Sequence, residues 1–359
     1  MKTIDPEADF LYIEIPGKTF LSGEYLALYG GPSLTVSTGP GFKMFFIRKK
    51  RNTSAKNSNV YSDLYSQWGP DLDKDFIRMS LSPAGLFYTQ FEQVLSEWDI
   101  LFHDGYQRKG GFGASTAQFL GLYLFHEWLQ GKTAKSLDLN ELIRVYWKSQ
   151  SSKINSRDDL NEIYKLPSGH DLLAQCYPGF HFFQKIWKSE NQMRDKTSIK
   201  SEVFDFEIDM SLVPWPFPEL NLFLVFTGNK TPTHVHLEQL KDFNFEELLV
   251  VQKKIQFCFE NKLQGDFIEN LKKWRELLQQ KNFVCSASIE LVKKLEIHSE
   301  ILFAKGCGAL GSDVLLILGD KSQTNKIKKV IMELGLGPIF DSSDVWQQPI
   351  EVKKMNLPG

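Results

Sequence analysis

The chain has 359 residues, of which 42% are hydrophobic and 24% are charged. These proportions are typical of a packed soluble protein and exclude disorder over most of the length. The 42 Lys and Arg residues nearly balance 44 Asp and Glu residues, for a net charge of -2. Proteins that grip a nucleic-acid backbone usually carry a basic excess, so this balance argues against that function. Four cysteines without a CxxC pair predict neither a disulfide framework nor a zinc site, and favour a cytoplasmic location.

The N-terminal part begins with segments typical of strands. Residues 10–15 alternate between apolar and polar and run into Pro16-Gly17, which we expect to end the strand. Further strands are expected at residues 33–38 and 42–48. Residues 114–130 are apolar on nearly every face, which predicts a buried helix.

The next helix and a domain boundary have recognisable signals. Gly131 is well placed to end the first helix. Asp138 followed three residues later by Glu141 is typical of a capping box, and predicts a helix start. Three prolines within residues 196–220 indicate a crossing between domains. We therefore predict one domain over residues 1–205 and another over 206–359.

The second part alternates strands and helices. Strands are expected at residues 221–227 and 314–318, a long helix at 245–262, and an amphipathic helix around 327–334 that ends at Gly335. This mixture predicts an α+β or α/β fold rather than an all-β one. The apolar segments are far shorter than the roughly 20 residues that cross a bilayer, so we expect no membrane span.

Two loops of small residues are candidates for a phosphate site. Residues 109–116 (KGGFGAST) lead directly into the first helix. Glycines allow a ligand close to the backbone, and a helix N-terminus favours phosphate. Residues 305–313 (KGCGALGSD) form a second such loop, immediately before a buried strand. Either loop could be a structural turn, but one in each half makes a cradle between domains more plausible.

Two charged residues, Lys18 and Asp171, are candidates for a catalytic role. Lys18 follows Pro-Gly after a strand, where it can point into a cleft and neutralise phosphate or simply be solvated. Asp171 follows the turn-like residues 167–170 (PSGH). It can serve as a helix N-cap or as a carboxylate aimed at a substrate hydroxyl.

These motifs together resemble those of the GHMP kinase superfamily, the small-molecule kinases named for galactose, homoserine, mevalonate and phosphomevalonate. Pro16-Gly17-Lys18 and the two small-residue loops occur in that superfamily's order, and the resemblance covers residues 10 to about 340. It implies a two-domain α+β fold with its active site between the domains. The N-terminal domain would be like domain 2 of ribosomal protein S5, and the C-terminal domain ferredoxin-like.

Within the superfamily the motifs are most similar to the phosphomevalonate kinase branch. The similar segments are residues 109–115, 227–233 and 305–313. Residues 168–171 with residues 177–179 resemble that branch too, but residues 167–171 (PSGHD) are also close to mevalonate kinases. The resemblance therefore implies a kinase of the mevalonate pathway of isoprenoid biosynthesis that uses ATP and Mg²⁺. Its small-molecule acceptor would be phosphomevalonate, with mevalonate as the alternative. The longer serine-rich motif of mevalonate diphosphate decarboxylases is not found.

The resemblance also implies roles for individual residues. Asp171 would be the catalytic carboxylate, with Lys18 beside it to stabilise charge on the transferring group. Contacts with ATP would come from Lys109, Gly111, Gly113, Ala114, Ser115 and Thr116, and Ser115 would also contact the metal. The acceptor side would be formed by Tyr25, Ser168, Gly169, Cys307, Gly308 and Ala309. The extra charge of phosphomevalonate would be met by Lys109, Lys230 and Lys305.

Several positions depart from the superfamily pattern. Ala114 stands where a Ser is usual, and Leu310 and Ser312 stand where glycines are usual. Leu160 occupies the position of a Mg²⁺-binding Glu of mevalonate kinases. The acidic metal ligand stays open among Asp158, Asp159 and Glu162. These departures motivate a second hypothesis, a non-catalytic sensor that binds a nucleotide or metabolite, whereas Lys18 together with Asp171 favours the kinase. Composition does not indicate an oligomeric state.

Overall fold

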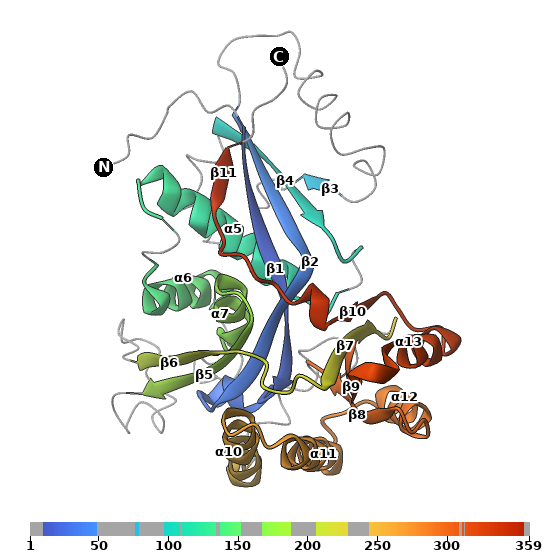
Figure 1. Cartoon of the computed structure of the whole chain (residues 1–359). Coiled ribbons are helices and arrows are strands. Elements are labelled where there is room, and N and C mark those ends of the chain that lie inside the picture. Colours follow the sequence, from blue (N-terminus) through green and yellow to red (C-terminus); the bar gives the residue numbers. More distant parts are fainter. Residues whose placement is uncertain are drawn as a thin grey trace.

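Two antiparallel sheets with helices packed on them make up the described part of the chain (Figure 1). The computed structural model describes residues 10–48, 76–78, 97–107, 110–133, 137–151, 167–187, 206–228, 244–308, 311 and 313–354. Within these ranges, none of the helices is long and apolar enough to cross a membrane.

The larger sheet has seven strands. They are β1 (Phe10–Ser22), β2 (Ser33–Arg48), β3 (Phe76–Arg78), β4 (Trp98–Asp104), β5 (Phe180–Trp187), β6 (Phe206–Val213) and β11 (Val352–Lys354). The order along one path is β11-β1-β2-β4-β3, while β5 pairs with β2 and β6 pairs with β5. Strands β1 and β2 form the long central pair of Figure 1.

Strands β1 and β2 differ from the sequence prediction. β1 does not end at Pro16-Gly17 but shifts register there and continues, with residues 17–20 paired to residues 35–38. The two strands expected around residues 33–48 are therefore one strand, β2. An irregularity at this point accommodates a proline, which has no N–H to donate to the neighbouring strand. As a result Lys18 lies within the sheet rather than in a turn.

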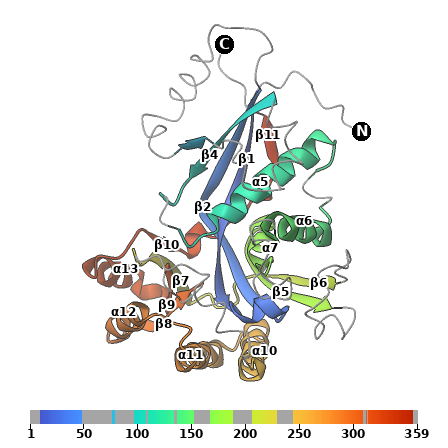
Figure 2. The ribbon, with the colours of Figure 1, turned by 180° about the vertical axis from the view of Figure 1, so that it is seen from behind.

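Three helices accompany this sheet: α5 (Ala114–Leu129), α6 (Leu139–Ser151) and α7 (His170–Cys176). α5 and α7 contact both β1 and β2, and α6 contacts β6 (Figure 2). The prediction of a buried helix at 114–130 is confirmed, since nine consecutive or near-consecutive residues of α5 are buried. The α6 start is confirmed as well, because Asp138 Oδ1 accepts hydrogen bonds from the Asn140 and Glu141 amides at 3.0 and 3.1 Å.

The smaller sheet has four strands in the order β10-β7-β9-β8. They are β7 (Leu220–Phe226), β8 (Ile301–Cys307), β9 (Val314–Asp320) and β10 (Ile339–Asp341). The helices of this half are α10 (Glu246–Glu260), α11 (Gln264–Gln280), α12 (Ser286–Glu296) and α13 (Thr324–Glu333). The predicted strands β7 and β9 and helices α10 and α13 are confirmed, and α12 and α13 contact β8 and β9, respectively.

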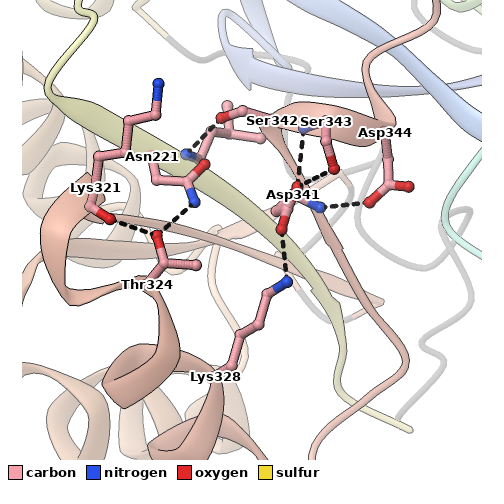
Figure 3. A network of polar contacts seen from close by, with 9 residues as sticks. Asn221, Lys321, Thr324, Lys328, Asp341, Ser342, Ser343 and Asp344 are labelled. Carbon is pink, nitrogen blue, oxygen red and sulfur yellow. Dashed lines mark hydrogen bonds and ion pairs between the residues drawn. The ribbon is translucent and has the colours of Figure 1, made fainter.

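A polar network holds the segment that leads from the smaller sheet back to the larger one (Figure 3). Asp341, the last residue of β10, pairs with Lys328 of α13 at 2.7 Å. Its amide donates to Asp344 Oδ2 at 2.8 Å, which completes a capping box for a short 3₁₀ turn, η7 (Ser342–Asp344). The next residue, Val345, forms an isolated β-bridge with β2. The network therefore fixes where the two sheets meet.

The sheets do not divide the chain at one point. The predicted division between residues 205 and 206 falls just before β6, which pairs along its length with β5 of the larger sheet. β11, near the C-terminus, returns to pair with β1. One hydrophobic core includes residues of both sheets, such as Leu11 of β1 and Phe303 of β8. The position of the boundary between the two domains stays a prediction.

Candidate active site

Lys18 and Asp171 form an ion pair between β1 and α7. Lys18 Nζ lies 2.6 Å from Asp171 Oδ1, and their side chains are 9% and 34% exposed, respectively. The N-cap of α7 is Gly169, whereas Asp171 lies in the first helical turn. The alternatives in which Lys18 is solvated and Asp171 caps a helix are therefore wrong. The pair presents a carboxylate that solvent, and hence a substrate, can reach.

The pair lies beside the N-terminus of α5. Gly113 caps this helix with a φ of 87°, and Gly110 and Gly111 also have positive φ values. The Lys18 amide donates to the Phe112 carbonyl at 3.0 Å. A Cβ atom on Gly113 would approach Lys18 Cε to 3.1 Å, so the lysine side chain passes directly over the loop. The long α5 helix directs its unpaired N–H groups and positive dipole end toward this region.

Gln175 of α7 connects these parts and was missed in the sequence. Its Nε2 donates to the Pro16 carbonyl at 2.9 Å and to the Gly113 carbonyl at 3.2 Å. The side chain is fully buried. Gln175 thus joins β1, the glycine loop and α7 in one arrangement. No local pattern indicates this role, because its partners lie 159 and 62 positions away.

The two small-residue loops meet, as the sequence led us to expect. A Cβ atom on Gly111 would come within 2.6 Å of Val314 Cγ2 and 2.9 Å of Asp313 Cβ. The Asp313 carbonyl in turn accepts a hydrogen bond from the Thr227 amide at 3.2 Å. Glycine is needed at position 111 both for this contact and for its φ of 78°. Lys109, Ala309, Leu310 and Ser312 lie outside the described residues.

The remaining residues expected to bind ATP differ in how exposed their side chains are. Ser115 is exposed in the first turn of α5, and Ala114 beside it is half-buried. Thr116 is only 2% exposed. Its hydroxyl hydrogen-bonds Tyr146 of α6. Ser115 is therefore the hydroxyl of this motif that a ligand can reach, while Thr116 packs between helices.

The residues expected on the acceptor side come from different parts of the chain. Ser168 and Gly169 precede α7, next to Asp171, and Gly308 follows β8 with a φ of 75°. Tyr25 is buried, where it stacks on Phe283 with 4.4 Å between ring centroids and donates to its carbonyl at 3.2 Å.

Cys307, the last residue of β8, is 2% exposed. Burial raises the pKa of its thiol, which fits a small packed side chain rather than a reactive one.

Lys305 is engaged within the protein. It forms an ion pair with Glu24, which follows β1, and both side chains are at least 95% buried. Trp274 of α11 also donates to Glu24 Oε2 at 3.2 Å. Lys305 was expected to meet the charge of a substrate phosphate, but its own charge is balanced by Glu24. Lys230, the other lysine proposed for that task besides Lys109, lies outside the described residues.

No protein-family model matches the sequence, and no curated protein matches it. Solved structures do match. Phosphomevalonate kinase of Streptococcus pneumoniae is 15% identical with a TM-score of 0.62, over 93% of this chain and 99% of that one. It has also been solved with phosphomevalonate and AMPPNP. Galactokinase of Lactococcus lactis with galactose is 12% identical with a TM-score of 0.61, over 97% and 95%.

A third match is L. major mevalonate kinase in complex with R-mevalonate, 12% identical with a TM-score of 0.58, over 95% of this chain and 96% of that one. The three proteins are sugar and mevalonate-pathway kinases of the GHMP type. Each alignment spans nearly the whole of both chains, so the likeness concerns the complete architecture. At these identities it shows the fold, and this chain has the two-domain α+β fold of the GHMP kinases.

Proposed function

We propose that this chain is an ATP-dependent kinase that transfers the γ-phosphoryl group to phosphomevalonate, with mevalonate as the alternative acceptor. The observation that carries the proposal is the Lys18–Asp171 pair beside the N-terminus of α5. A carboxylate, a lysine and a helix N-terminus in one place are suited to phosphoryl transfer, which depends mainly on positioning and charge stabilisation.

Each part of the site has a distinct task in this mechanism. The glycine loop and the first turn of α5 would hold the ATP phosphates through backbone N–H groups. Asp171 would orient the acceptor hydroxyl and accept its proton as the new P–O bond forms. Lys18 would stabilise the negative charge on the transferring group. Gln175 holds the loop and α7 in register for this step.

Magnesium would be bound mainly by the nucleotide. No group of three or more His, Cys, Asp or Glu side chains that could hold a metal occurs among the described residues. Leu160 and the candidate acidic ligands Asp158, Asp159 and Glu162 lie outside those residues. Mg²⁺ typically keeps several waters and takes one or two protein oxygens besides phosphates. The exposed Ser115 hydroxyl at the α5 N-terminus fits such a role. The ion would neutralise phosphate charge there.

Phosphomevalonate is preferred because of the similarity of three motifs, and because a structurally similar kinase binds it. The pairing of Lys305 with Glu24 bears on this choice. The phosphate of the acceptor would have to be met by other cations, of which Lys109 and Lys230 stay candidates. If neither contributes, mevalonate, which lacks that phosphate, becomes the better acceptor.

The test is a coupled ADP-release assay with Mg-ATP, with phosphomevalonate, mevalonate and no acceptor in parallel. We expect turnover on phosphomevalonate and a fall of about 10³-fold in Asp171→Asn, with ATP affinity within about threefold. Asp209→Asn is the matched control, since Asp209 is exposed on β6, opposite Gln184 of β5. ATP binding without turnover on either acceptor would support the sensor, and no ATP binding would refute both hypotheses.

A further inference from the structure

The turn before α7 is held by side chains from two other elements. Trp147 of α6 donates its indole N–H to the Pro167 carbonyl at 2.8 Å. Lys185 of β5 donates from Nζ to the Ser168 carbonyl at 2.7 Å. Two consecutive carbonyls are thus fixed immediately before the helix that carries Asp171. Neither donor belongs to the residues that the proposed mechanism uses.

The burial of Lys185 is unusual for a lysine. The residue is 3% exposed, and its ammonium lies 5.0 Å from the centroid of the Trp147 ring. Burying a lysine is costly, so its contacts must compensate. Burial lowers the pKa of Lys185 to about 7. Both the ammonium and the neutral amine carry N–H groups, so the bond to Ser168 can form in either state.

The first residues of α7 have a further anchor on the sheet. His170 Nδ1 and Ser33 Oγ of β2 lie 2.7 Å apart in a hydrogen bond. Burial and the nearby Lys185 hold the pKa of His170 well below its usual range, so the ring is neutral. The Ser168 hydroxyl accepts a hydrogen bond from the His170 amide at 3.2 Å. Four hydrogen bonds therefore hold the turn: two to its consecutive carbonyls, one between His170 and Ser33, and one from the His170 amide to the Ser168 hydroxyl.

The position of Asp171 depends on this turn. α7 has only seven residues, and Asp171 is the second of them. Its N-cap, Gly169, has a φ of 80°, and Ile143 of α6 would lie 3.3 Å from a Cβ there. The C-terminal part of α7 is held by Gln175. A displacement of the turn would therefore tilt the first turn of the helix and move the Asp171 carboxylate relative to Lys18.

We propose that Lys185 is a positioning residue for Asp171, acting through its hydrogen bond to the Ser168 carbonyl. The kinetic consequence rests on the proposed kinase function, because misplacing a catalytic group by about 1 Å can cost about 10²-fold in rate. The effect of Lys185 on the structure of α7 does not rest on that function, because it can be measured without activity. Lysine suits the task because its long side chain reaches from the strand to the turn.

The kinetic test uses Lys185→Met, which keeps the unbranched apolar stem and removes the donor. We expect kcat to fall about 10- to 100-fold, with KM for Mg-ATP within about threefold because the α5 N-terminus is untouched. Trp147→Phe removes the neighbouring donor and keeps an aromatic ring, and should show a smaller fall of the same kind. Lys272→Met, which breaks an ion pair with Glu269 within α11, is the control and should leave kcat unchanged.

Hydrogen exchange gives a readout that needs no activity. In Lys185→Met, hydrogen-bonded amides of α7 such as that of Leu173, which donates to the Gly169 carbonyl, should exchange about tenfold faster, with β7 and β9 unchanged. Unaltered kcat and unaltered α7 exchange in a folded variant would overturn the proposal. If Lys185→Met does not fold, the same comparison in Trp147→Phe decides. A wild-type protein inactive on all acceptors would refute the kinase hypothesis, while the exchange result would still decide the role of Lys185.

Discussion

At the scale of single residues, Lys18 offers a direct test of the pair. In Lys18→Met the Asp171 side chain stays partly hydrated, since it is 34% exposed, but Oδ1, which faces Lys18, is buried and loses its partner. We therefore expect a loss of stability of about 1–3 kcal/mol. Turnover should fall about 10²- to 10³-fold, because charge on the transferring group loses its stabilisation. Urea unfolding and kcat/KM measure the two effects.

Lys43→Met is the matched control for this variant. Lys43 also belongs to the β1–β2 pair, where it lies 3.6 Å from Glu14. The Lys43→Met substitution removes the same charge from the same sheet, but Lys43 pairs with Glu14 and not with Asp171. Wild-type turnover in Lys43→Met and a loss in Lys18→Met would assign the effect to the pair with Asp171. Equal turnover in both variants would contradict it.

The buried amine of Lys185 predicts a pH dependence of stability. Burial lowers its pKa from 10.5 to about 7. Between these values the unfolded chain binds more protons at this residue than the folded chain does. The stability of the wild type relative to Lys185→Met should therefore rise with pH from about 7 to 10, by up to about 1.4 kcal/mol per pH unit. Urea unfolding of both proteins at several pH values measures this difference, and a constant difference would contradict the prediction.

Only some residues of the candidate site could be identified from the sequence. Lys18 and Asp171 were found because both belong to short motifs that resemble those of known kinases. Gln175 and Trp147 were not, because their partners are backbone carbonyls that only the folded chain brings near. Lys185 did carry a signal: it shares one face of β5 with the buried His181 and Phe183 by strand alternation. A lysine at such a position is seldom solvated.

At the scale of elements, helices were easier to predict than strands. α5, α6 and α13 have continuous apolar patterns or caps that local sequence determines. β1 and β2 were divided wrongly, because Pro-Gly usually ends a strand and here lies at a change of register. β6 was taken as part of a connection between domains, since half of its residues are exposed and polar side chains interrupt the apolar ones.

The glycine at the start of α5 can be tested against the glycine after its end. Gly113 and Gly131 both have positive φ, 87° and 78°, so alanine strains the backbone at either position by about 1 kcal/mol. Only at Gly113 would the new methyl group meet Lys18 and Gln175, at 3.1 and 3.2 Å. Nothing lies within 4 Å at Gly131. Gly113→Ala should therefore also displace Lys18 from the loop.

We expect Gly113→Ala to weaken ATP binding about tenfold or more, and Gly131→Ala to leave it within about twofold. Titration calorimetry with Mg-ATP measures both affinities, and thermal unfolding shows whether the two variants lose similar stability. A similar affinity in the two alanine variants would mean that the α5 N-terminus does not bind the nucleotide. That result would weaken the kinase and the sensor hypotheses together.

At the scale of the whole molecule, the two sheets are joined by more than a shared apolar core. β1 contacts β8, and at this junction Glu24 pairs with Lys305 while Trp274 donates to the same carboxylate. Glu24 follows the strand that carries Lys18, and Lys305 is the first residue of the second small-residue loop. The pair can therefore hold the two halves of the candidate site at a fixed separation.

A double-mutant cycle on Glu24 and Lys305 tests this connection. Lys305→Met leaves the Glu24 carboxylate buried beside Trp274 without its cation, which should cost about 3–5 kcal/mol of unfolding free energy. Glu24→Gln in the Lys305→Met background removes the stranded charge while an amide oxygen can still accept from Trp274. The double variant should therefore be more stable than Lys305→Met alone. Additive losses would show that the two side chains do not interact.

The course of unfolding decides whether the pair acts on one half or on both. Glu24 follows β1 of the larger sheet, and Lys305 belongs to β8 of the smaller one. Loss of the ion pair should therefore lower the stability of both sheets together. Urea transitions followed by tryptophan fluorescence and by far-UV circular dichroism should then stay coincident in Lys305→Met, with a lower midpoint. Two separated transitions would instead mean that the sheets unfold independently, and that the shared core alone does not make the molecule one cooperative unit.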